Sequence, residues 1–524
     1  MSELKFKRHT KDVRIEVKTS GPRPRAPIAA ASSPPHPALA HAAPSTMHDD
    51  GASTDTSPFA GPLGGNGSTR TWLERKRSAA GLCPAFVFFG STTFTVSFSF
   101  RENSLVALDS DLNVIDTLEV PRRSIDWSRL FSGGLSIEAI TRRLFRDTSG
   151  GAYFFVEDDG RVVIPTSANT MWRIKLEGGK LTKEKPFDFN PEDGGPYGGK
   201  RLPSPAFGNA VCADEGVCID YAAQHRVISA LPTWGDEDSY WFATNLGVVG
   251  VLVAPPNSKA VTLDLNNKAD NPWARSQQDE RIQNSFSVGA KGAFVVSDYA
   301  LYRFVYDGDQ IRIAWRVAVP RTVRKGPKPG HVGMGSGTTP TLIRDDYVAI
   351  TDAGEQMKVI LCTQDTHADH KPKVSTHIAF DGAIESACEN SLVSFGNHLI
   401  LGNTWGYITP FEKKKRKDGV LGVEGYEIVG GGKLKKRWDS PVNVMSAPPK
   451  LGRKNATLYA YTQNDEKDWA LVGMDPWSGD VVYRGVVYDD DDRDNDNAWG
   501  TIGIGPEDQL FVAQWSGLLR ITDD

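Results

Sequence analysis

Polar side chains that could bind or transform a small molecule gather just before several apolar strands of this sequence. The groups are Gln283, Asn284 and Ser285; Ser336, Thr338 and Thr339; Glu389, Asn390 and Ser391; and Asp494, Asp496 and Asn497. Amides, hydroxyls and carboxylates supply the few oriented polar contacts that a ligand site needs. We take Asn284, Ser285, Thr338, Thr339, Glu389, Asn390 and Asn497 as candidate ligand-binding residues. The alternative is that they hydrogen-bond neighbouring backbone and ordered water.

Two other groups could hold a metal ion. The acidic run at residues 489–497 could bind calcium, with Asp494 and Asp496 as candidate ligands, because hard cations prefer several carboxylate oxygens. It lacks the central Gly and terminal Glu of an EF-hand loop, so a solvated loop is the favoured interpretation. His367, Asp369 and His370 lie close together, but without a third histidine or cysteine we favour a hairpin tip.

Catalytic residues cannot be assigned from spacing. The glycine-flanked run at residues 335–340 lacks the Gly-Lys-Ser/Thr ending of a phosphate loop. The histidines His225, His331, His377 and His398 show no nucleophile–base spacing. A Ser-His-Asp triad stays open, because its members can come from distant parts of a chain.

A repeat along the chain must position these residues. Apolar strands end at polar turns roughly 52–59 residues apart, at Asn245, Asp298, Asp352, Thr404, Gln463 and Trp515. This is the period of a sheet-per-repeat array. One four-stranded sheet cannot bury both faces, whereas sheets stacked radially can. The repeat therefore predicts an all-β β-propeller with eight four-stranded blades, seven being the alternative.

The ends of the chain complete this organisation. The eighth repeat offers only three strands, so we expect the segment around residues 66–82 to supply the fourth. The propeller then covers residues 66–524, closed by pairing of this N-terminal segment with the last blade. Residues 1–65 are rich in Pro, Ala and Ser, which predicts a disordered tail. In such a ring the candidate ligand-binding residues would surround one mouth of the central channel.

Residues 472–487 carry a family resemblance. Asp475 and Gly479 form a hairpin turn, Tyr483 follows, and Trp315 and Trp438 end comparable outer strands. The unit resembles the pyrroloquinoline-quinone (PQQ)-type repeat, and residues 83–524 resemble quinoprotein-like β-propeller proteins of uncharacterised function. The resemblance implies the fold. Quinoprotein alcohol dehydrogenases use two adjacent cysteines, and no two of the five cysteines here are adjacent, which argues against a quinone cofactor.

Composition limits the partners. The net charge of −5 argues against a general nucleic-acid surface, so a small-molecule ligand is favoured over nucleic acid. The basic run at residues 413–417 is interpreted as an exposed loop, with a nuclear-localisation signal as the alternative. No secretory signal or apolar membrane span is present, which predicts a cytoplasmic protein, or a nuclear one if the basic run acts as a localisation signal.

Two functions remain open. The first is a soluble β-propeller that binds a small molecule at the channel mouth and could act on it as an enzyme, oxidoreductive or secondary-metabolic. The second is a non-catalytic scaffold that recruits a protein partner through its tail or a propeller face.

Overall fold

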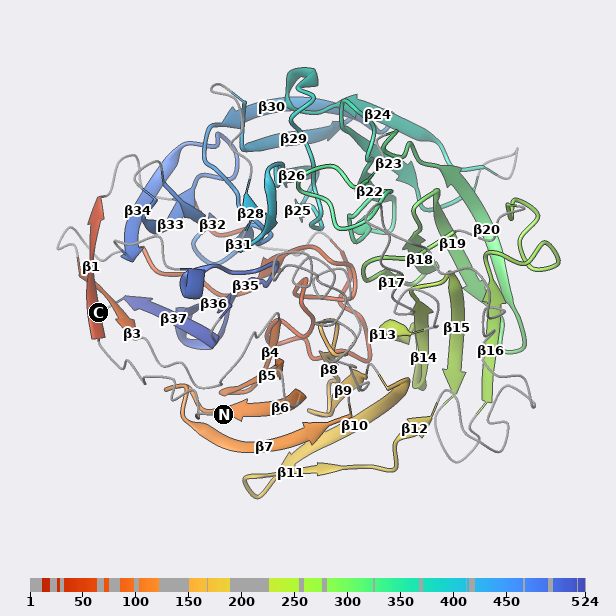
Figure 1. The fold of residues 1–524 in the computed structure, drawn as a ribbon, viewed down its shortest axis with the longest axis horizontal. Coiled ribbons are helices and arrows are strands. Elements are labelled where there is room, and N and C mark those ends of the chain that lie inside the picture. Colours follow the sequence, from red (N-terminus) through yellow and green to blue (C-terminus); the bar gives the residue numbers. More distant parts are fainter. Residues whose placement is uncertain are drawn as a thin grey trace, which may run out of the picture.

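Eight β-sheets stand in a ring around a central axis in the computed structural model (Figure 1). The structure describes residues 12–18, 26–28, 33–63, 70–74, 85–98, 103–121, 150–166, 168–188, 226–253, 259–275, 280–323, 326–366, 371–410, 412–413, 420–464, 467–488, 493–515 and 517–523. The prediction of an eight-bladed propeller is confirmed, and the alternative of seven blades is wrong.

Each blade is an antiparallel sheet whose strands follow one another outward from the axis. Blades one to four comprise β4 (Phe86–Phe89), β5 (Thr92–Phe98), β6 (Asn103–Leu108) and β7 (Val114–Val120); β8 (Phe155–Val156), β9 (Val162–Pro165), β10 (Thr170–Glu177) and β11 (Lys180–Lys183), with β12 (Phe187–Asp188) beside β10; β13 (Val227–Thr233), β14 (Asp236–Thr244), β15 (Val248–Val253) and β16 (Lys259–Asp264); and β17 (Ser287–Gly289), β18 (Gly292–Val296), β19 (Ala300–Tyr306) and β20 (Ile311–Ala318).

Blades five to eight repeat the arrangement. They comprise β21 (Thr341–Ile343), β22 (Tyr347–Thr351), β23 (Lys358–Thr363) and β24 (Val374–Ile378); β25 (Val393–Phe395), β26 (His398–Gly402), β29 (Val423–Val429) and β30 (Lys433–Ser440); β31 (Lys450–Gly452), β32 (Thr457–Gln463), β33 (Trp469–Met474) and β34 (Val481–Tyr488); and β35 (Ile502–Ile504), β36 (Leu510–Gln514) and β37 (Gly517–Asp523).

The third strand of blade six differs from the sequence-based expectation. The sequence predicts that residues 406–412 form it, but β27 (Tyr407–Thr409) and β28 (Glu412–Lys413) make a separate small hairpin. The chain returns to the sheet only at β29, which pairs with β26. Pro410 within the run cannot donate a ladder hydrogen bond, which disfavours pairing of the run with β26.

The hydrophobic core is a ring of layers between neighbouring blades. One cluster joins blades four and five through Leu301, Trp315, Val348 and Ile360, and the other clusters similarly span adjacent sheets. The inner strands are buried on both faces, whereas β24 at the rim alternates between half-buried and exposed residues. Each sheet thus buries its faces against two neighbours, which explains the nearly continuous apolar runs in the sequence.

The polar residues at the repeated turns form hydrogen bonds within one blade. They link the end of the second strand to the backbone just before the first strand. The side-chain oxygens of Asn245 and Asp298 accept hydrogen bonds from the backbone N–H groups of Arg226 and Arg281, at 2.7 and 2.9 Å. Asn403 does the same for Ala387 at 3.1 Å. These repeated residues therefore have a structural role, because each satisfies a backbone donor at a buried strand entry.

Strands from the N-terminal part of the chain extend the last two sheets. β3 (Arg70–Glu74) pairs antiparallel with β37 as the outermost strand of blade eight. β1 (Asp12–Lys18) pairs with β3 and also with β34 of blade seven. The two sheets thereby form one continuous ten-stranded sheet, in which β3 and β1 cover edges that would otherwise be open.

Residues 33–63, called here the channel segment, run through the centre of the ring (Figure 1). Most of their side chains are buried, including Leu39, Met47 and Thr54. The prediction of a disordered tail therefore does not extend to this segment, although its composition is poor in apolar residues. Its stability comes from hydrogen bonds to the surrounding blades rather than from an apolar face of its own.

Backbone carbonyls of the channel segment meet one blade after another. Those of Gly51, Ala52, Thr54 and Asp55 accept hydrogen bonds of 2.8–3.0 Å, and the donors are the inner-strand N–H groups of Val288, Leu342, Ser394 and Leu451 in blades four to seven. The Ser57 hydroxyl donates to the Ile504 carbonyl of blade eight at 2.7 Å. The segment thus pairs with inner strand edges that would otherwise be free. It occupies the centre of the ring, so the inner strands do not line an open channel there.

A buried ionic group fixes the channel segment. Lys450 Nζ lies 2.5 Å from Asp55 Oδ1 and 3.4 Å from Asp49 Oδ1, and it donates to the Met47 carbonyl. All of these side chains are almost fully buried. Burial opposes the ionisation of Asp55, but the nearby Lys450 and His48 hold its pKa down at about 2. For Asp49, burial dominates and raises the pKa to about 7.

Candidate functional site

Asn284 and Glu389, from the entries to blades four and six, meet at the channel mouth. Asn284 Nδ2 lies 3.2 Å from Glu389 Oε1 and also donates to the Gly337 carbonyl from the entry to blade five. Three of the polar groups singled out in the sequence therefore come together across 105 residues of chain. The geometry follows from the fold, because equivalent strand entries of successive blades face the same end of the channel.

Tyr153 extends this group from the entry to blade two. Its hydroxyl donates to Asn284 Oδ1 at 3.1 Å. Burial, reinforced by the charge of Glu389, raises the pKa of the Tyr153 phenol well above its usual range. The phenol therefore stays protonated and acts as a hydrogen-bond donor at all ordinary pH values.

His331 places an imidazole against the Glu389 carboxylate. His331 Nδ1 lies 3.3 Å from Glu389 Oε2, and both side chains are almost fully buried. Within the described residues, neither ring nitrogen of His331 nor this oxygen makes a properly aligned hydrogen bond. Nδ2 of the adjacent Asn390 is likewise buried without a partner there. Unsatisfied buried polar atoms are costly, and several in one place are a mark of a functional site.

A glycine-rich loop covers the pair, and its glycines allow close approach. A Cβ at Gly337 would overlap the Glu389 carboxylate, and one at Gly335 would overlap the Asp298 backbone. Gly330 has a φ of +95°, and a Cβ there would meet the Thr404 carbonyl. The loop at residues 326–339 can therefore pack directly against blades four and six only because these three positions are glycines.

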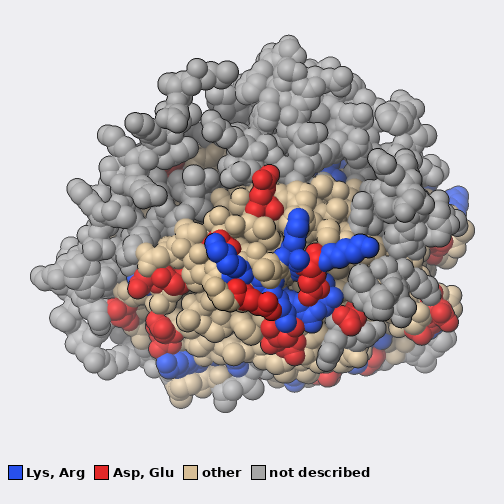
Figure 2. All heavy atoms as spheres, turned by 90° about the horizontal axis from the view of Figure 1, so that it is seen from below, with Lys and Arg blue, Asp and Glu red and all other residues tan. Residues whose placement is uncertain are grey.

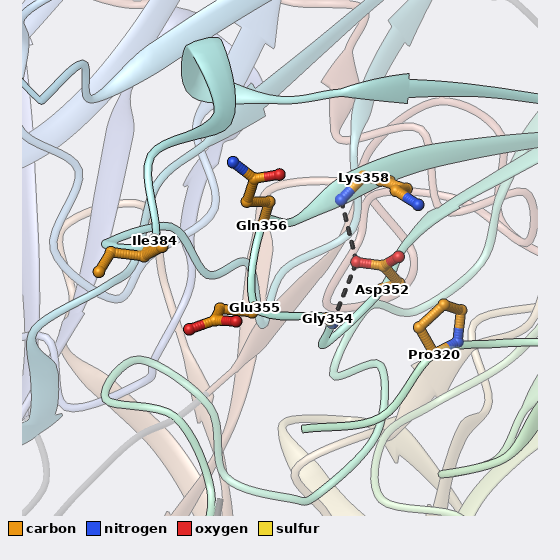
Figure 3. A pocket seen from close by; sticks show the side chains of 7 residues that line it. All are labelled: Pro320, Asp352, Gly354, Glu355, Gln356, Lys358 and Ile384. Carbon is orange, nitrogen blue, oxygen red and sulfur yellow. Dashed lines mark hydrogen bonds between the residues drawn. The ribbon is translucent and has the colours of Figure 1, made fainter. Parts of the chain in front are cut away.

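The same loop borders an open pocket of about 410 Å³ on blade five (Figure 3). Its lining residues are Pro320, Asp352, Gly354, Glu355, Gln356, Lys358 and Ile384. Lys328 of the loop donates to the Gly354 carbonyl at 2.8 Å. Asp352 Oδ1 accepts the N–H groups of Gly354 and Lys358, whereas Oδ2 is buried without a hydrogen bond in the described structure. Burial raises the pKa of the Asp352 carboxyl.

Three other predicted ligand-binding residues have structural partners. Ser285 Oγ lies 2.7 Å from Ser229 Oγ, and Thr338 Oγ1 lies 2.7 Å from Thr351 Oγ1. Asn497 accepts from Ser446 at 2.9 Å and donates to the Gly500 carbonyl. Thr339 is buried at the entry to blade five. The structure thus brings only Asn284 and Glu389 into side-chain contact with one another.

Asp496 does not have the surroundings of a calcium ligand. Its carboxylate is buried, with Lys413 Nζ 2.7 Å from Oδ2 and the Tyr407 hydroxyl donating to Oδ1 at 2.5 Å. An ammonium ion already neutralises it. Asp494 lies half-buried in the short 3-10 turn η3 (Arg493–Asn495). Among the residues that the structure describes, no cluster of three or more His, Cys, Asp or Glu side chains could hold a metal. Residues 367–370, 414–417 and 489–492 lie outside them.

His48, Ser391 and Asp55 have the composition of a catalytic triad but not its geometry. Ser391 Oγ lies 2.6 Å from His48 Nδ1, and Asp55 Oδ1 lies 3.3 Å from the same nitrogen. Ser391 also donates directly to Asp55 Oδ2. A triad needs the serine and the carboxylate on different ring nitrogens. This group therefore anchors the channel segment.

Sequence reasoning missed Tyr153, His331 and the channel segment. His331 lies in the glycine-rich loop at residues 326–339. The glycines around it, which permit close backbone approach to other blades, are the signal that could have indicated it. Tyr153 precedes the short strand β8 without a distinctive pattern. For the channel segment, the run of Ser, Thr and Asp at residues 53–57 is the only indication of dense hydrogen bonding.

The outer rim of blade two carries both signs of charge. Arg161 and Lys175 lie 2.8 and 3.0 Å from Asp159, and Arg173 lies 3.5 Å from Glu184. Viewed from this side, the described surface shows acidic and basic side chains interspersed rather than separated (Figure 2). Such a surface offers no extended field to a polyanion. None of the helices in the described parts of the chain is both long and apolar enough to cross a membrane.

Comparisons with known proteins do not assign a family. No family model matches the chain. An uncharacterised protein of Archaeoglobus fulgidus is 27% identical over 308 residues, which is 53% of this chain and 58% of that protein. The chain therefore matches little more than half the length of this relative. The resemblance to the PQQ-type repeat is not confirmed and stays a prediction.

Solved structures with similar folds have diverse roles. Sqt1 of Chaetomium thermophilum has a TM-score of 0.45 at 11% identity, covering 86% of this chain and 100% of that chain. A chain of the mitotic checkpoint complex has a TM-score of 0.38 at 10% identity, with coverages of 70% and 86%. Streptogramin B lyase has a TM-score of 0.36 at 10% identity, with coverages of 87% and 98%. These similarities are too low to carry any inference about function.

Proposed function

We propose that this β-propeller binds a small polar molecule at the channel mouth, beneath the glycine-rich loop. The observation that carries the proposal is the buried Glu389–His331 pair, whose facing polar atoms lack hydrogen-bond partners in the described structure. Asn284 donates to the other carboxylate oxygen, and the Tyr153 hydroxyl donates to Asn284. A ligand hydroxyl or amine would satisfy these atoms.

The pair could also act on the bound molecule. A carboxylate and an imidazole side by side can accept and return a proton, which is the basis of general acid–base catalysis. The Tyr153 phenol, kept protonated by burial, would stabilise negative charge on Glu389 through Asn284. Neither a quinone nor calcium belongs to the proposal, since no two cysteines are adjacent and Lys413 already pairs with Asp496.

The test is a native mass measurement, with absorbance, on full-length protein purified from its native host. We expect the wild type to carry extra mass from a bound molecule and Glu389→Gln to lose it, through affinity weakened at least ~10-fold by loss of a charged acceptor. Glu427→Gln, in the same blade but paired with Arg437 near the surface, should retain it.

Two outcomes would overturn the proposal: extra mass that survives in Glu389→Gln, or a wild type with no bound molecule that also binds nothing from a metabolite extract. The second outcome would favour the scaffold alternative. A protein partner captured by the full chain but not by a chain lacking residues 1–32 would then support recruitment through the N-terminal part.

A further inference from the structure

Trp273 presents an indole to solvent at the junction of blades three and four. Its exposed fraction is 50%, unusual for so large an apolar side chain. The surrounding loop is well fixed: buried Asn271 donates to the Leu265 carbonyl at 2.8 Å and accepts from the Trp273 N–H at 3.2 Å. Ala274 next to it is buried. The loop therefore holds the indole outward in one orientation, as a binding surface would.

Arg316 on β20 lies beside this indole. Its guanidinium carbon is 6.0 Å from the centre of the Trp273 ring and 5.6 Å from that of Tyr302. Arg316 Nε donates to the Tyr302 hydroxyl at 3.0 Å, and that hydroxyl donates to the buried Glu280 at 2.7 Å. These contacts orient the guanidinium through one edge and leave its other N–H groups for further acceptors.

Two more arginines converge on the neighbouring Tyr299. The guanidinium carbons of Arg275 and Arg321 lie 4.5 and 3.9 Å from the centre of its ring. Arg321 also pairs with Asp298 at 3.0 Å, but its Nε is buried without a hydrogen bond in the described structure. The two guanidinium groups add positive charge on the Tyr299 side of the indole.

We propose that Trp273, Arg275, Tyr299, Arg316 and Arg321, called the arginine–aromatic patch, bind an anion that carries an aromatic ring, of the nucleotide class. The exposed face of Trp273 accepts the planar base by stacking. Arg316 receives the phosphate, because a guanidinium matches its oxygens with paired N–H groups. Arginine, tryptophan and tyrosine are also the residue types that dominate binding surfaces. This site is separate from the one proposed at the channel mouth.

The same chemistry is offered by a free nucleotide and by a single-stranded nucleic acid, where bases stack on aromatic side chains. Quenching of tryptophan fluorescence on the full-length protein separates them. One arm titrates adenosine monophosphate, with adenosine and inorganic phosphate as partial ligands, and the other titrates a single-stranded oligoadenylate. We expect saturable quenching by adenosine monophosphate, and weaker binding by either fragment alone.

Variants assign the quenching to the patch. Trp273→Phe should remove most of the signal, although 12 of the 13 tryptophans remain. Arg316→Ala should weaken binding of the monophosphate about 10-fold, as for loss of one charge-assisted contact, and leave adenosine binding nearly unchanged. Arg312→Ala is the matched control, since Arg312 lies on the same strand and pairs with Asp307 at 3.5 Å.

The outcomes are distinct. Saturable binding by the oligoadenylate alone would identify a nucleic-acid strand as the source of the nucleotide. Absence of quenching by both, or equal calorimetric affinity in the wild type and Trp273→Ala, would overturn the proposal. Binding of an acidic peptide but of no nucleotide would also overturn it. Trp273→Ala keeps the test valid if Arg316→Ala unfolds, because the indole is half exposed and contributes little to the core.

Discussion

The positive charge of Lys450 balances buried negative charge in the channel. Its ammonium group, fully buried, is the cation that faces Asp55 and Asp49, and the channel segment supplies both carboxylates. A buried pair of this kind adds little net stability over an apolar pair, but removal of one partner leaves an uncompensated charge. The side chain therefore matters more for holding one particular segment in place than for total stability.

Lys450→Met is expected to destabilise the protein by ~3–5 kcal/mol, because Asp55 would remain buried with only neutral or weakly charged neighbours. Denaturant unfolding monitored by circular dichroism would measure the change. Lys454→Met is the control: its partner Asp508 lies 2.6 Å away at the surface, so a cost of at most ~1 kcal/mol is expected. Equal effects of the two variants would contradict the assigned role of Lys450.

At the scale of single residues, the sequence predicted the site only in part. Asn284 and Glu389 could be chosen because strand entries of a propeller converge on the channel, and the structure joins them. Ser285, Thr338 and Asn497 have the same polarity and position, yet they bond to neighbouring chain. His331 could not be assigned, because its contact with Glu389 depends on how a glycine-rich loop crosses two blades.

Among the elements, the loop at residues 326–339 links three blades. Its backbone lies on Asp298 of blade four, Lys328 holds blade five, and Gly330 accepts from the Thr404 hydroxyl of blade six. The position and shape of the candidate site therefore depend on this loop more than on the sheets.

Gly337→Ala tests that dependence. The added methyl group would overlap the Glu389 carboxylate, so we expect a loss of ~1–3 kcal/mol in stability and a displaced loop. Gly326→Ala is the control, because a Cβ there meets nothing within 4 Å and the backbone is not left-handed. Thermal unfolding and ligand retention of both variants would be compared. A Gly337→Ala protein with unchanged melting and ligand content would contradict the close packing described.

The regular elements were predictable because their pattern is local. The apolar strands that end at Asn245, Asp298 and Asn403 could be recognised from the sequence. Each of these side chains accepts a hydrogen bond from the equivalent backbone N–H group of its own blade, so the pattern recurs. The third strand of blade six could not, because the β27–β28 hairpin interrupts the register and resembles a strand. An insertion of this kind leaves no periodic signal.

At the scale of the whole molecule, the channel segment fills the centre of the ring and is hydrogen-bonded to the surrounding blades. It pairs inner strands of blades four to eight and also accepts from Phe88 and Val156 of blades one and two, through the Pro44 and Ser45 carbonyls. Composition alone predicted disorder here, because hydrogen bonds to a ring that forms elsewhere in the chain leave no mark on hydrophobicity.

Deletion of residues 1–63 should abolish cooperative folding. The inner-strand N–H groups of Val288, Leu342, Ser394 and Leu451 would lose their acceptors, and Lys450 its carboxylates, each at a cost of ~1–3 kcal/mol or more. Calorimetry and solubility of the truncated chain would show this. Deletion of residues 1–11 is the control and should melt as the full chain does. A cooperative transition in the chain lacking residues 1–63 would contradict the proposed contribution of the segment.

The channel segment also constrains when the molecule can mature. Residues 33–63 leave the ribosome before every blade that they contact, and Ser391, Lys450 and Ile504 are synthesised hundreds of residues later. Its contacts with blades one and two can form early, whereas those with Lys450 and Ile504 must wait for the last blades. Docking of the whole segment can therefore be completed only near the end of synthesis.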